Sequence, residues 1–229
     1  MELVVHDSPA AVAGAVSSSV SQEINEKAST GETTFSLGLA GGSTPESTYK
    51  NLAATSTDWQ TVTAWLADER WVPHDSPRSN GLMAAQALFD HVPAKLVRPE
   101  FSEEMAPDES ASGYGRFLRD LHLETPPDLV LLGLGDDGHT ASLFPGSRAL
   151  DETQHRYVSN VIPETGEIRL TATYPFLNTA RRIVFLVVGE AKALALEASL
   201  AGKTPAGRVG GSETRVEWHV DRPAASRLS

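Results

Sequence analysis

A histidine and two aspartates lie among glycines in the segment Gly135-Asp136-Asp137-Gly138-His139. An imidazole with a reference pKa of about 6.5 can be neutral at cellular pH and still accept a proton. A neighbouring carboxylate can fix the tautomer of the histidine and stabilise the imidazolium, which is what activation of a water molecule requires. We therefore interpret His139 as a candidate general base with Asp137 as its partner. A capping histidine and a divalent metal site are the alternatives, and we favour proton transfer over both.

Metal coordination has little support in the sequence. The chain has no cysteine, which removes thiolate ligands, thiolate nucleophiles and disulfides together. Its Asp and His residues lack a recognisable ligand pair such as His-Glu-x-x-His. We expect neither a metal nor another cofactor.

A glycine pair followed by two hydroxyl residues, Gly41-Gly42-Ser43-Thr44, lies between a predicted strand and a predicted helix. Backbone N–H groups in such a turn can approach a phosphate or a developing oxyanion, and a helix N-terminus adds favourable partial charge. The alternative is a tight turn in which Ser43 caps the helix, and this feature alone slightly favours the cap. Because Pro45 stands where a nucleophile elbow requires glycine, we do not predict Ser43 to be a nucleophile.

Charged residues beyond other predicted strands supply further candidates. Asp68-Glu69-Arg70 is predicted to form a turn, in which a carboxylate could position water or a substrate hydroxyl and Arg70 could pair with an anion. A salt-bridged surface turn is the alternative, because charged triplets at turns are common. Arg169 and Lys192 could each bind phosphate. Taken alone, both are more commonly interpreted as solvated surface cations.

Periodic apolar residues predict alternating strands and helices. Val12, Val16, Val20 and Ile24 recur at helical spacing, and residues 128–133 form an apolar run typical of a central strand covered on both faces. We predict strands at residues 35–40, 62–67, 128–133, 157–161, 183–188 and 216–220. We predict helices that begin near residues 9, 43, 80, 108 and 192, the second of them with a capping box at 43–46.

This alternation predicts a parallel sheet with right-handed crossovers and helices on both faces. The expected fold class is α/β, Rossmann-like and doubly wound, with a mainly parallel sheet. Because no repeat, low-complexity tract or clear linker interrupts it, we expect residues 1–229 to form a single domain, with a mobile loop at 202–214. Ligands bind such sheets beyond the carboxyl ends of the strands. We expect the segments 41–44, 68–70, 135–139 and 189–192 to lie there, because each follows a predicted strand.

The composition limits the partners of this chain. Its formal net charge of −11 opposes binding to nucleic acid and to anionic membrane surfaces. It contains no apolar run of membrane-spanning length and no signal-peptide pattern, so we expect a cytoplasmic location. An anionic substrate would have to meet locally concentrated Arg and Lys side chains. The sequence does not determine the oligomeric state, and a monomer is compatible with it.

Several of these segments together resemble the 6-phosphogluconolactonase family, which shares its fold with the glucosamine-6-phosphate deaminases. The resemblance spans nearly the whole chain, and the order and spacing of its segments argue against a chance match. These segments are residues 39–45, 67–73, 79–80, 135–145, 169–171 and 189–194.

The resemblance implies metal-free hydrolysis of 6-phospho-D-glucono-1,5-lactone, a small-molecule sugar phosphate, in the oxidative pentose phosphate pathway. It implies that His139 is the general base for the attacking water, with Asp137 beside it and Asp68 helping to organise the site. The residues that it implies for holding the phosphate or shaping its pocket are Gly42, Ser43, Thr44, Arg70, Arg169 and Lys192.

Two differences favour the lactonase over a deaminase-isomerase. Deaminases with this resemblance typically carry Asn-Glu-Pro where this chain has Leu143-Phe144-Pro145, and Phe144 supplies no carboxylate for ring opening and amine chemistry. They also usually carry an aromatic residue where this chain has Arg70. A non-catalytic sugar-phosphate sensor is a further alternative, but no basic helix-turn-helix segment or partner domain is visible.

The chain departs from the family pattern at two places. Asp136 occupies a position that is often uncharged in the family, so its charge could influence His139. The segment Pro205-Ala206-Gly207-Arg208-Val209 only approximates a Pro-Ala-Ser pattern. We therefore assign no role to Arg208.

Overall fold

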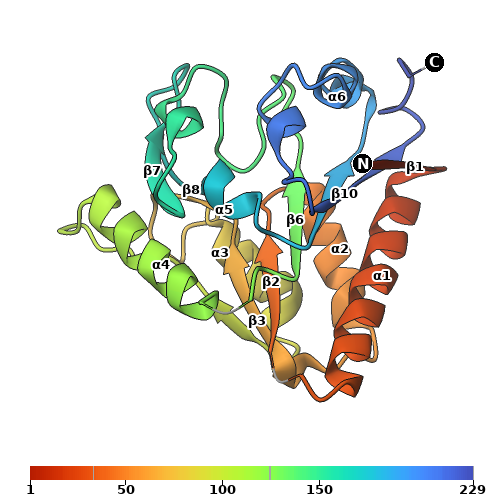
Figure 1. Ribbon diagram of the computed structural model, residues 1–229, viewed down its shortest axis with the longest axis horizontal. Coiled ribbons are helices and arrows are strands. Elements are labelled where there is room, and N and C mark those ends of the chain that lie inside the picture. The colour runs from red at the N-terminus through yellow and green to blue at the C-terminus, as the bar shows by residue number, and fades with distance from the viewer. Residues whose placement is uncertain (33, 124, 229) are drawn as a thin grey trace.

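The computed structural model describes residues 1–32, 34–123 and 125–228, and at its centre lies a seven-stranded sheet in which all neighbouring strands are parallel (Figure 1). In order across this sheet the strands are β1 (Glu2–His6), β10 (Arg215–Asp221), β9 (Arg182–Val187), β6 (Leu129–Gly133), β2 (Phe35–Leu39), β3 (Val62–Leu66) and β5 (Lys95–Val97). The apolar run predicted as a central strand is β6, the fourth of the seven.

Helices cover both faces of the sheet, with α1 and α2 on one side and α4 on the other (Figure 1). The helices are α1 (Pro9–Ser29), α2 (Ser43–Ala53), α3 (Asn80–Ala84), which continues as a π-helical turn over Ala85–Phe89, α4 (Pro107–Leu121), α5 (Tyr174–Leu177) and α6 (Ala193–Leu200). Adjacent residues of β6 serve opposite faces, because side chains alternate along a strand. Leu131 belongs to the buried cluster that contains Val16 of α1, and Leu132 to the cluster that contains Leu118 of α4. The predicted doubly wound α/β fold is confirmed.

The strand order reverses between β2 and β6. From β2 the chain continues to β3 and β5 on one side, and then returns to β6, which leads to β9 and β10 on the other side. Loops from two such neighbouring strands leave in opposite directions and open a crevice at the carboxyl end of the sheet. The glycine pair after β2 and the histidine loop after β6 flank this crevice.

A second, smaller sheet was not predicted. It contains β4 (Asp68–Arg70), β8 (Ile168–Ala172) and β7 (Tyr157–Val161), which pair antiparallel. The predicted turn at 68–70 is therefore wrong, because these charged residues form a short strand whose first two members are buried. Their pairing sets Arg70 opposite Arg169, two candidate residues that lie far apart in the sequence.

Other local predictions need correction. The strands β1 and β5 were missed, and the capping box at 43–46 is wrong, because Gly42 is the N-cap of α2 and none of the described side chains caps it. Residues 202–214 include a 3₁₀ turn, Ala206–Arg208, that is hydrogen bonded to the histidine loop through Ala206 N and Gly138 O at 3.0 Å. The mobility of this segment stays a prediction.

Candidate active site

A cleft of about 560 Å³ lies at the crevice between β2 and β6. Most of the site residues predicted from the sequence meet there. Those that line it are Gly42, Asp68, Arg70, Asp137, His139, Arg169 and Lys192. Ser43 and Thr44 lie outside the set of described residues that line the cleft, and Ser43 is exposed.

His139 and Asp137 form a hydrogen-bonded pair. Asp137 Oδ1 lies 2.6 Å from His139 Nδ1 and also accepts the backbone N–H of His139 at 3.1 Å. Because an ionised carboxylate only accepts hydrogen bonds, Nδ1 of the neutral imidazole must carry the proton. The lone pair then resides on Nε2. This is the tautomer that a general base requires.

The imidazole is also held by its neighbours. The ring of Phe144 lies against that of His139, with centroids 4.0 Å apart. At the opposite end of the loop, a Cβ placed on Gly135 would lie 2.1 Å from His139 Nδ1. Only glycine at position 135 leaves room for the imidazole, and this steric requirement accounts for the residue type.

Asp68 links β4 to the loop after β6 that carries His139. Its buried carboxylate accepts hydrogen bonds from Ser142 Oγ at 2.7 Å and from Asn80 Nδ2 at 3.2 Å. Ser142 lies in the same loop as His139. Asp137 thus contacts the imidazole itself, while Asp68 fixes the loop that carries it.

Glu69 stabilises the first turn of α3. Its buried carboxylate accepts hydrogen bonds from Ser79 Oγ and from the backbone N–H groups of Asn80 and Gly81, at 2.7 to 2.8 Å. A negative charge is favourable at a helix N-terminus. Of the two acids in the 68–70 segment, Glu69 therefore positions Asn80, and Asn80 in turn donates to Asp68.

Three cations line the cleft, and each already has polar partners. Arg70 donates to Arg78 O at 3.0 Å and to Asn80 Oδ1. Arg169 pairs with Glu167 at 2.9 Å, while its buried Nε has no hydrogen-bond partner among the described residues. Lys192 pairs with Asp136 at 2.6 Å. The cleft thus combines three cations with the His139–Asp137 pair and with the carboxylates of Asp68, Glu164 and Glu167.

The turn after β2 brings a helix N-terminus to the cleft. Gly42 has φ +109°, in the region that favours glycine, and directly precedes α2. Backbone N–H groups in the first helical turn lack intrahelical acceptors. This turn is suited to an anion through backbone groups, whereas the exposed Ser43 side chain is not placed to act in the cleft.

Comparisons with known proteins agree with this geometry. The sequence model of the family described as glucosamine-6-phosphate isomerases/6-phosphogluconolactonase matches residues 7–218. The chain belongs to this family. A relative named 6-phosphogluconolactonase from a Nostoc species is 36% identical over 206 residues, covering 85% of each chain.

Solved structures of this family have the same fold. The 6-phosphogluconolactonase from Trypanosoma brucei superposes with a TM-score of 0.86 and 29% identity, over 100% of this chain and 98% of that one. A structure described as a monomeric glucosamine-6-phosphate deaminase gives a TM-score of 0.82 at 24% identity, over 99% of each chain. This second likeness concerns the fold alone, so the reaction must be argued from the site.

Some cleft residues of this family member were not predicted. Asn80 and Ser142 connect Asp68 to its surroundings, and Glu167 pairs with Arg169; Asn80 and Glu167 also line the cleft. Ala141 also lines the cleft and is the one described non-glycine residue with positive φ, at 48°. A strained residue beside a candidate base fits a functional loop. Such features depend on contacts between distant segments, which a single sequence does not display.

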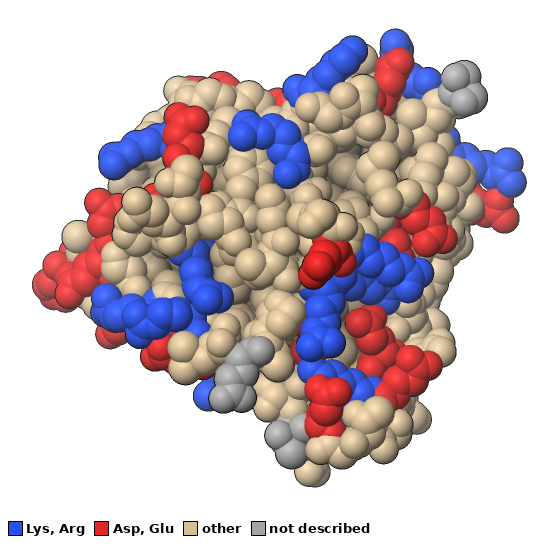
Figure 2. All heavy atoms as spheres, in the orientation of Figure 1, with Lys and Arg blue, Asp and Glu red and all other residues tan. Residues whose placement is uncertain are grey.

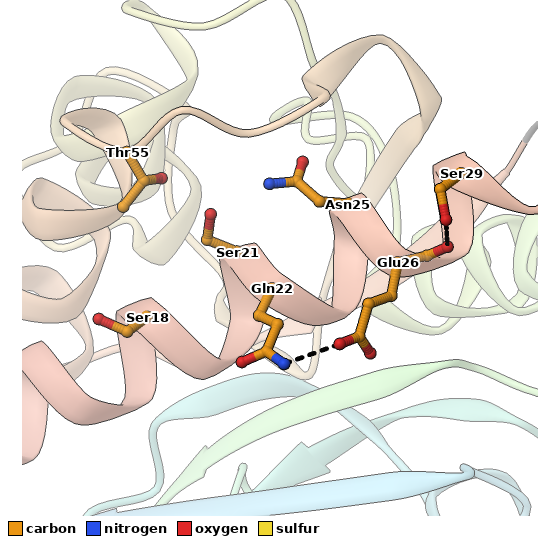
Figure 3. A pocket seen from close by; sticks show the side chains of 7 residues that line it. All are labelled: Ser18, Ser21, Gln22, Asn25, Glu26, Ser29 and Thr55. Atoms are coloured by element: carbon orange, nitrogen blue, oxygen red, sulfur yellow. Dashed lines mark hydrogen bonds between the residues drawn. The ribbon is translucent and has the colours of Figure 1, made fainter.

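A second hollow, of about 550 Å³, lies along α1 (Figure 3). Its lining residues are Ser18, Ser21, Gln22, Asn25, Glu26, Ser29 and Thr55. Glu26 accepts a hydrogen bond from Gln22 Nε2 at 2.7 Å and supplies the one formal charge among these residues. The hollow has no positive side chain for a phosphate, unlike the cleft at His139.

The surface shown in Figure 2 carries positive and negative side chains close together. Within the described ranges 1–32, 34–123 and 125–228, no helix has the length and hydropathy needed to cross a membrane.

Proposed function

We propose that this chain hydrolyses 6-phospho-D-glucono-1,5-lactone to 6-phospho-D-gluconate. The observation that carries the proposal is the His139–Asp137 pair, which leaves Nε2 of a cleft histidine able to accept a proton. The ring of Phe144 packs against this histidine and supplies no carboxylate at the position where the deaminases of this fold typically carry Glu. Relatives named 6-phosphogluconolactonase support the same reaction.

In the proposed mechanism, His139 Nε2 removes a proton from water while the water oxygen attacks the lactone carbonyl. Asp137 stabilises the imidazolium that forms, because its carboxylate accepts the Nδ1 proton. The tetrahedral oxyanion then expels the ring oxygen, which takes up the proton. A lactone is an activated ester, so positioning and base catalysis suffice without a covalent intermediate.

The phosphate of the substrate is proposed to bind the cationic side chains that line the cleft, which are Arg70, Arg169 and Lys192. The turn at Gly42, to which Ser43 and Thr44 also belong, is proposed to contribute to the same phosphate site. Residues 1–229 are proposed to act as one domain. The cytoplasmic location remains a prediction, and the sequence predicts no oligomeric state.

The test is lactone hydrolysis measured against the spontaneous background, in the presence of a chelator, for wild type and His139→Ala. We expect wild-type activity well above background and activity near background for the variant. Wild-type activity equal to background would end the proposal. Glucosamine 6-phosphate is the second substrate to assay, because release of ammonia from it would favour the deaminase reaction instead.

A further inference from the structure

Lys192 and Asp136 form an ion pair at the edge of the cleft, with Nζ and Oδ1 2.6 Å apart. Asp136 follows β6, and Lys192 ends the 3₁₀ turn Glu190–Lys192 that follows the neighbouring strand β9. Lys192 lines the cleft with a side chain that is 28% exposed, whereas the Asp136 side chain is 72% exposed. A phosphate that binds Lys192 must therefore displace or share the Asp136 carboxylate that is already paired with the Lys192 ammonium group.

We infer that Asp136 is a specificity-determining residue that competes with the phosphate of the ligand for Lys192. This inference rests on the proposed function, because it assumes that the phosphate binds in this cleft. It assigns to Asp136 an effect on ligand affinity that is separate from the proton transfer at His139.

The carboxylates around Arg169 differ from Asp136. Glu167 pairs with Arg78 as well as Arg169, and Asp68, whose Oδ2 lies 3.9 Å from Arg169 NH1, also accepts hydrogen bonds from Ser142 and Asn80. These additional bonds keep both carboxylates in place. The one ion-pair or side-chain hydrogen-bond partner that the described residues give Asp136 is Lys192. Exposed ion pairs contribute little free energy, so the Asp136 carboxylate can be displaced at low cost.

Two effects then weaken phosphate binding. Lys192 is partly neutralised before the ligand arrives, and a bound phosphate lies near the like charge of Asp136, which is unfavourable. The lactone substrate and the acid product carry the same phosphate, so both are affected. Asp136 thus lowers affinity for the substrate and favours release of the product.

The test is Asp136→Asn, which removes the charge and keeps the size of the side chain. We expect KM for the phosphorylated lactone to fall by about two- to fivefold, the range corresponding to one exposed ion pair, with kcat unchanged. KM for unphosphorylated glucono-1,5-lactone should not change. Glu197→Gln is the matched control, because it removes a carboxylate from an exposed ion pair, with Arg227, away from the cleft.

A double-mutant cycle with Lys192→Met separates this inference from other effects of Asp136. In the Lys192→Met background, Asp136→Asn should lower KM for the phosphorylated lactone by less than it does in the wild-type background, because the competition for Lys192 is gone and only the like-charge repulsion remains. If the decrease in KM is equally large in that background, Asp136 does not compete for Lys192 and the inference is wrong. If the pH profile of kcat shifts, Asp136 acts through Asp137 and His139, which also overturns it.

Titration calorimetry with inorganic phosphate keeps this test independent of the proposed reaction. The dissociation constant should be about two- to fivefold lower for Asp136→Asn than for wild type, even if wild type proves to have no lactonase activity. Equal dissociation constants for the two proteins would overturn the inference, whatever the activity assay shows.

Discussion

Asp137 Oδ1 lies 2.6 Å from Nδ1 of His139 and also accepts the backbone N–H of the same residue. One carboxylate oxygen therefore orients both the side chain and the backbone of the candidate base. Asp68 has its own partners in Ser142 and Asn80. The two aspartates act on the histidine loop at different points, and substitutions should separate them.

Asp137→Asn should lower kcat for the phosphorylated lactone by about 100-fold at neutral pH. The amide NH₂ can donate to Nδ1, which favours the tautomer with its proton on Nε2 and removes the base. KM should change little, because Asp137 is not proposed to contact the phosphate. Steady-state kinetics check this, with Asp136→Asn as the neighbouring control that retains kcat. Equal losses of kcat in both variants would contradict the assigned role.

Gly135→Ala should lower kcat by about 100-fold, because a displacement of the base by an ångström has that order of effect. The added Cβ would lie 2.1 Å from His139 Nδ1 and 2.7 Å from Asp137 Oδ1, so the imidazole must move. Far-UV circular dichroism should show an intact fold.

The control for that variant is Gly14→Ala in α1, where nothing lies within 4 Å of an added Cβ. Alanine there should stabilise the helix by roughly 0.5–1 kcal/mol and leave kcat unchanged. If Gly135→Ala were as active as Gly14→Ala, the close packing of Gly135 against the imidazole would have no catalytic importance.

Lys192→Ala should raise KM for the phosphorylated lactone by at least about tenfold, which is the change in affinity that corresponds to the free energy of one hydrogen bond to a charged group. KM for glucono-1,5-lactone should hardly change, since that substrate has no phosphate. Arg169→Ala should show the same preference, with an added decrease in kcat because Arg169 lies beside Asp68. Lys50→Ala, which removes an exposed cation of α2, is the control. Equal effects on both substrates would argue against a phosphate role.

The sequence predicted the centre of the main sheet because long apolar runs there are buried on both faces. Leu129 and its neighbours in β6 are examples. It did not predict β1, whose Leu3 and Val5 are exposed, or β5, which has three residues. It also missed β4, because the charged Asp68 and Glu69 are buried through hydrogen bonds with distant partners.

In the candidate site, too, local sequence patterns were predicted and contacts between distant segments were not. The His139 loop was predicted because glycines and acids cluster locally in the sequence. The ion pair of Asp136 with Lys192 joins loops from two neighbouring strands, so only the fold reveals it. Ser43 is a different case. Its position in a glycine-rich turn slightly favoured a helix cap, and the resemblance implied a role in holding the phosphate, but Gly42 is the N-cap and Ser43 is exposed.

Glu69→Gln should lower the free energy of unfolding by about 2 kcal/mol, because buried donors at the start of α3 lose a charged acceptor. For a chain of this length, that corresponds to a decrease in Tm of about 4–8 °C. Calorimetry checks the value, and Glu46→Gln, at an exposed pair in α2, should change Tm much less. A similar Tm for both variants would mean that Glu69 does not support the helix start.

Buried His122 should make stability depend on pH. Burial lowers the pKa of His122 to about 4. Its Nδ1 donates to Thr125 O at 3.2 Å, and its Nε2 accepts from Ser36 Oγ at 3.1 Å, an arrangement that fits the neutral imidazole. Between pH 6.5 and 4 the unfolded chain binds a proton that the folded chain does not. Stability is therefore present above pH 6.5 and is lost as the pH falls through this window.

The expected loss is roughly 3 kcal/mol, from a pKa difference of somewhat more than two units. Urea unfolding at several pH values should measure it, in wild type and in His122→Gln, which cannot titrate. Other groups contribute equally to both proteins, including His219, whose pKa is also lowered by burial. The difference between the two unfolding free energies isolates His122. As the pH falls from 6.5 to 4, the free energy of unfolding should decrease more for wild type than for His122→Gln. A difference between the two proteins that stays constant over this window would contradict the prediction.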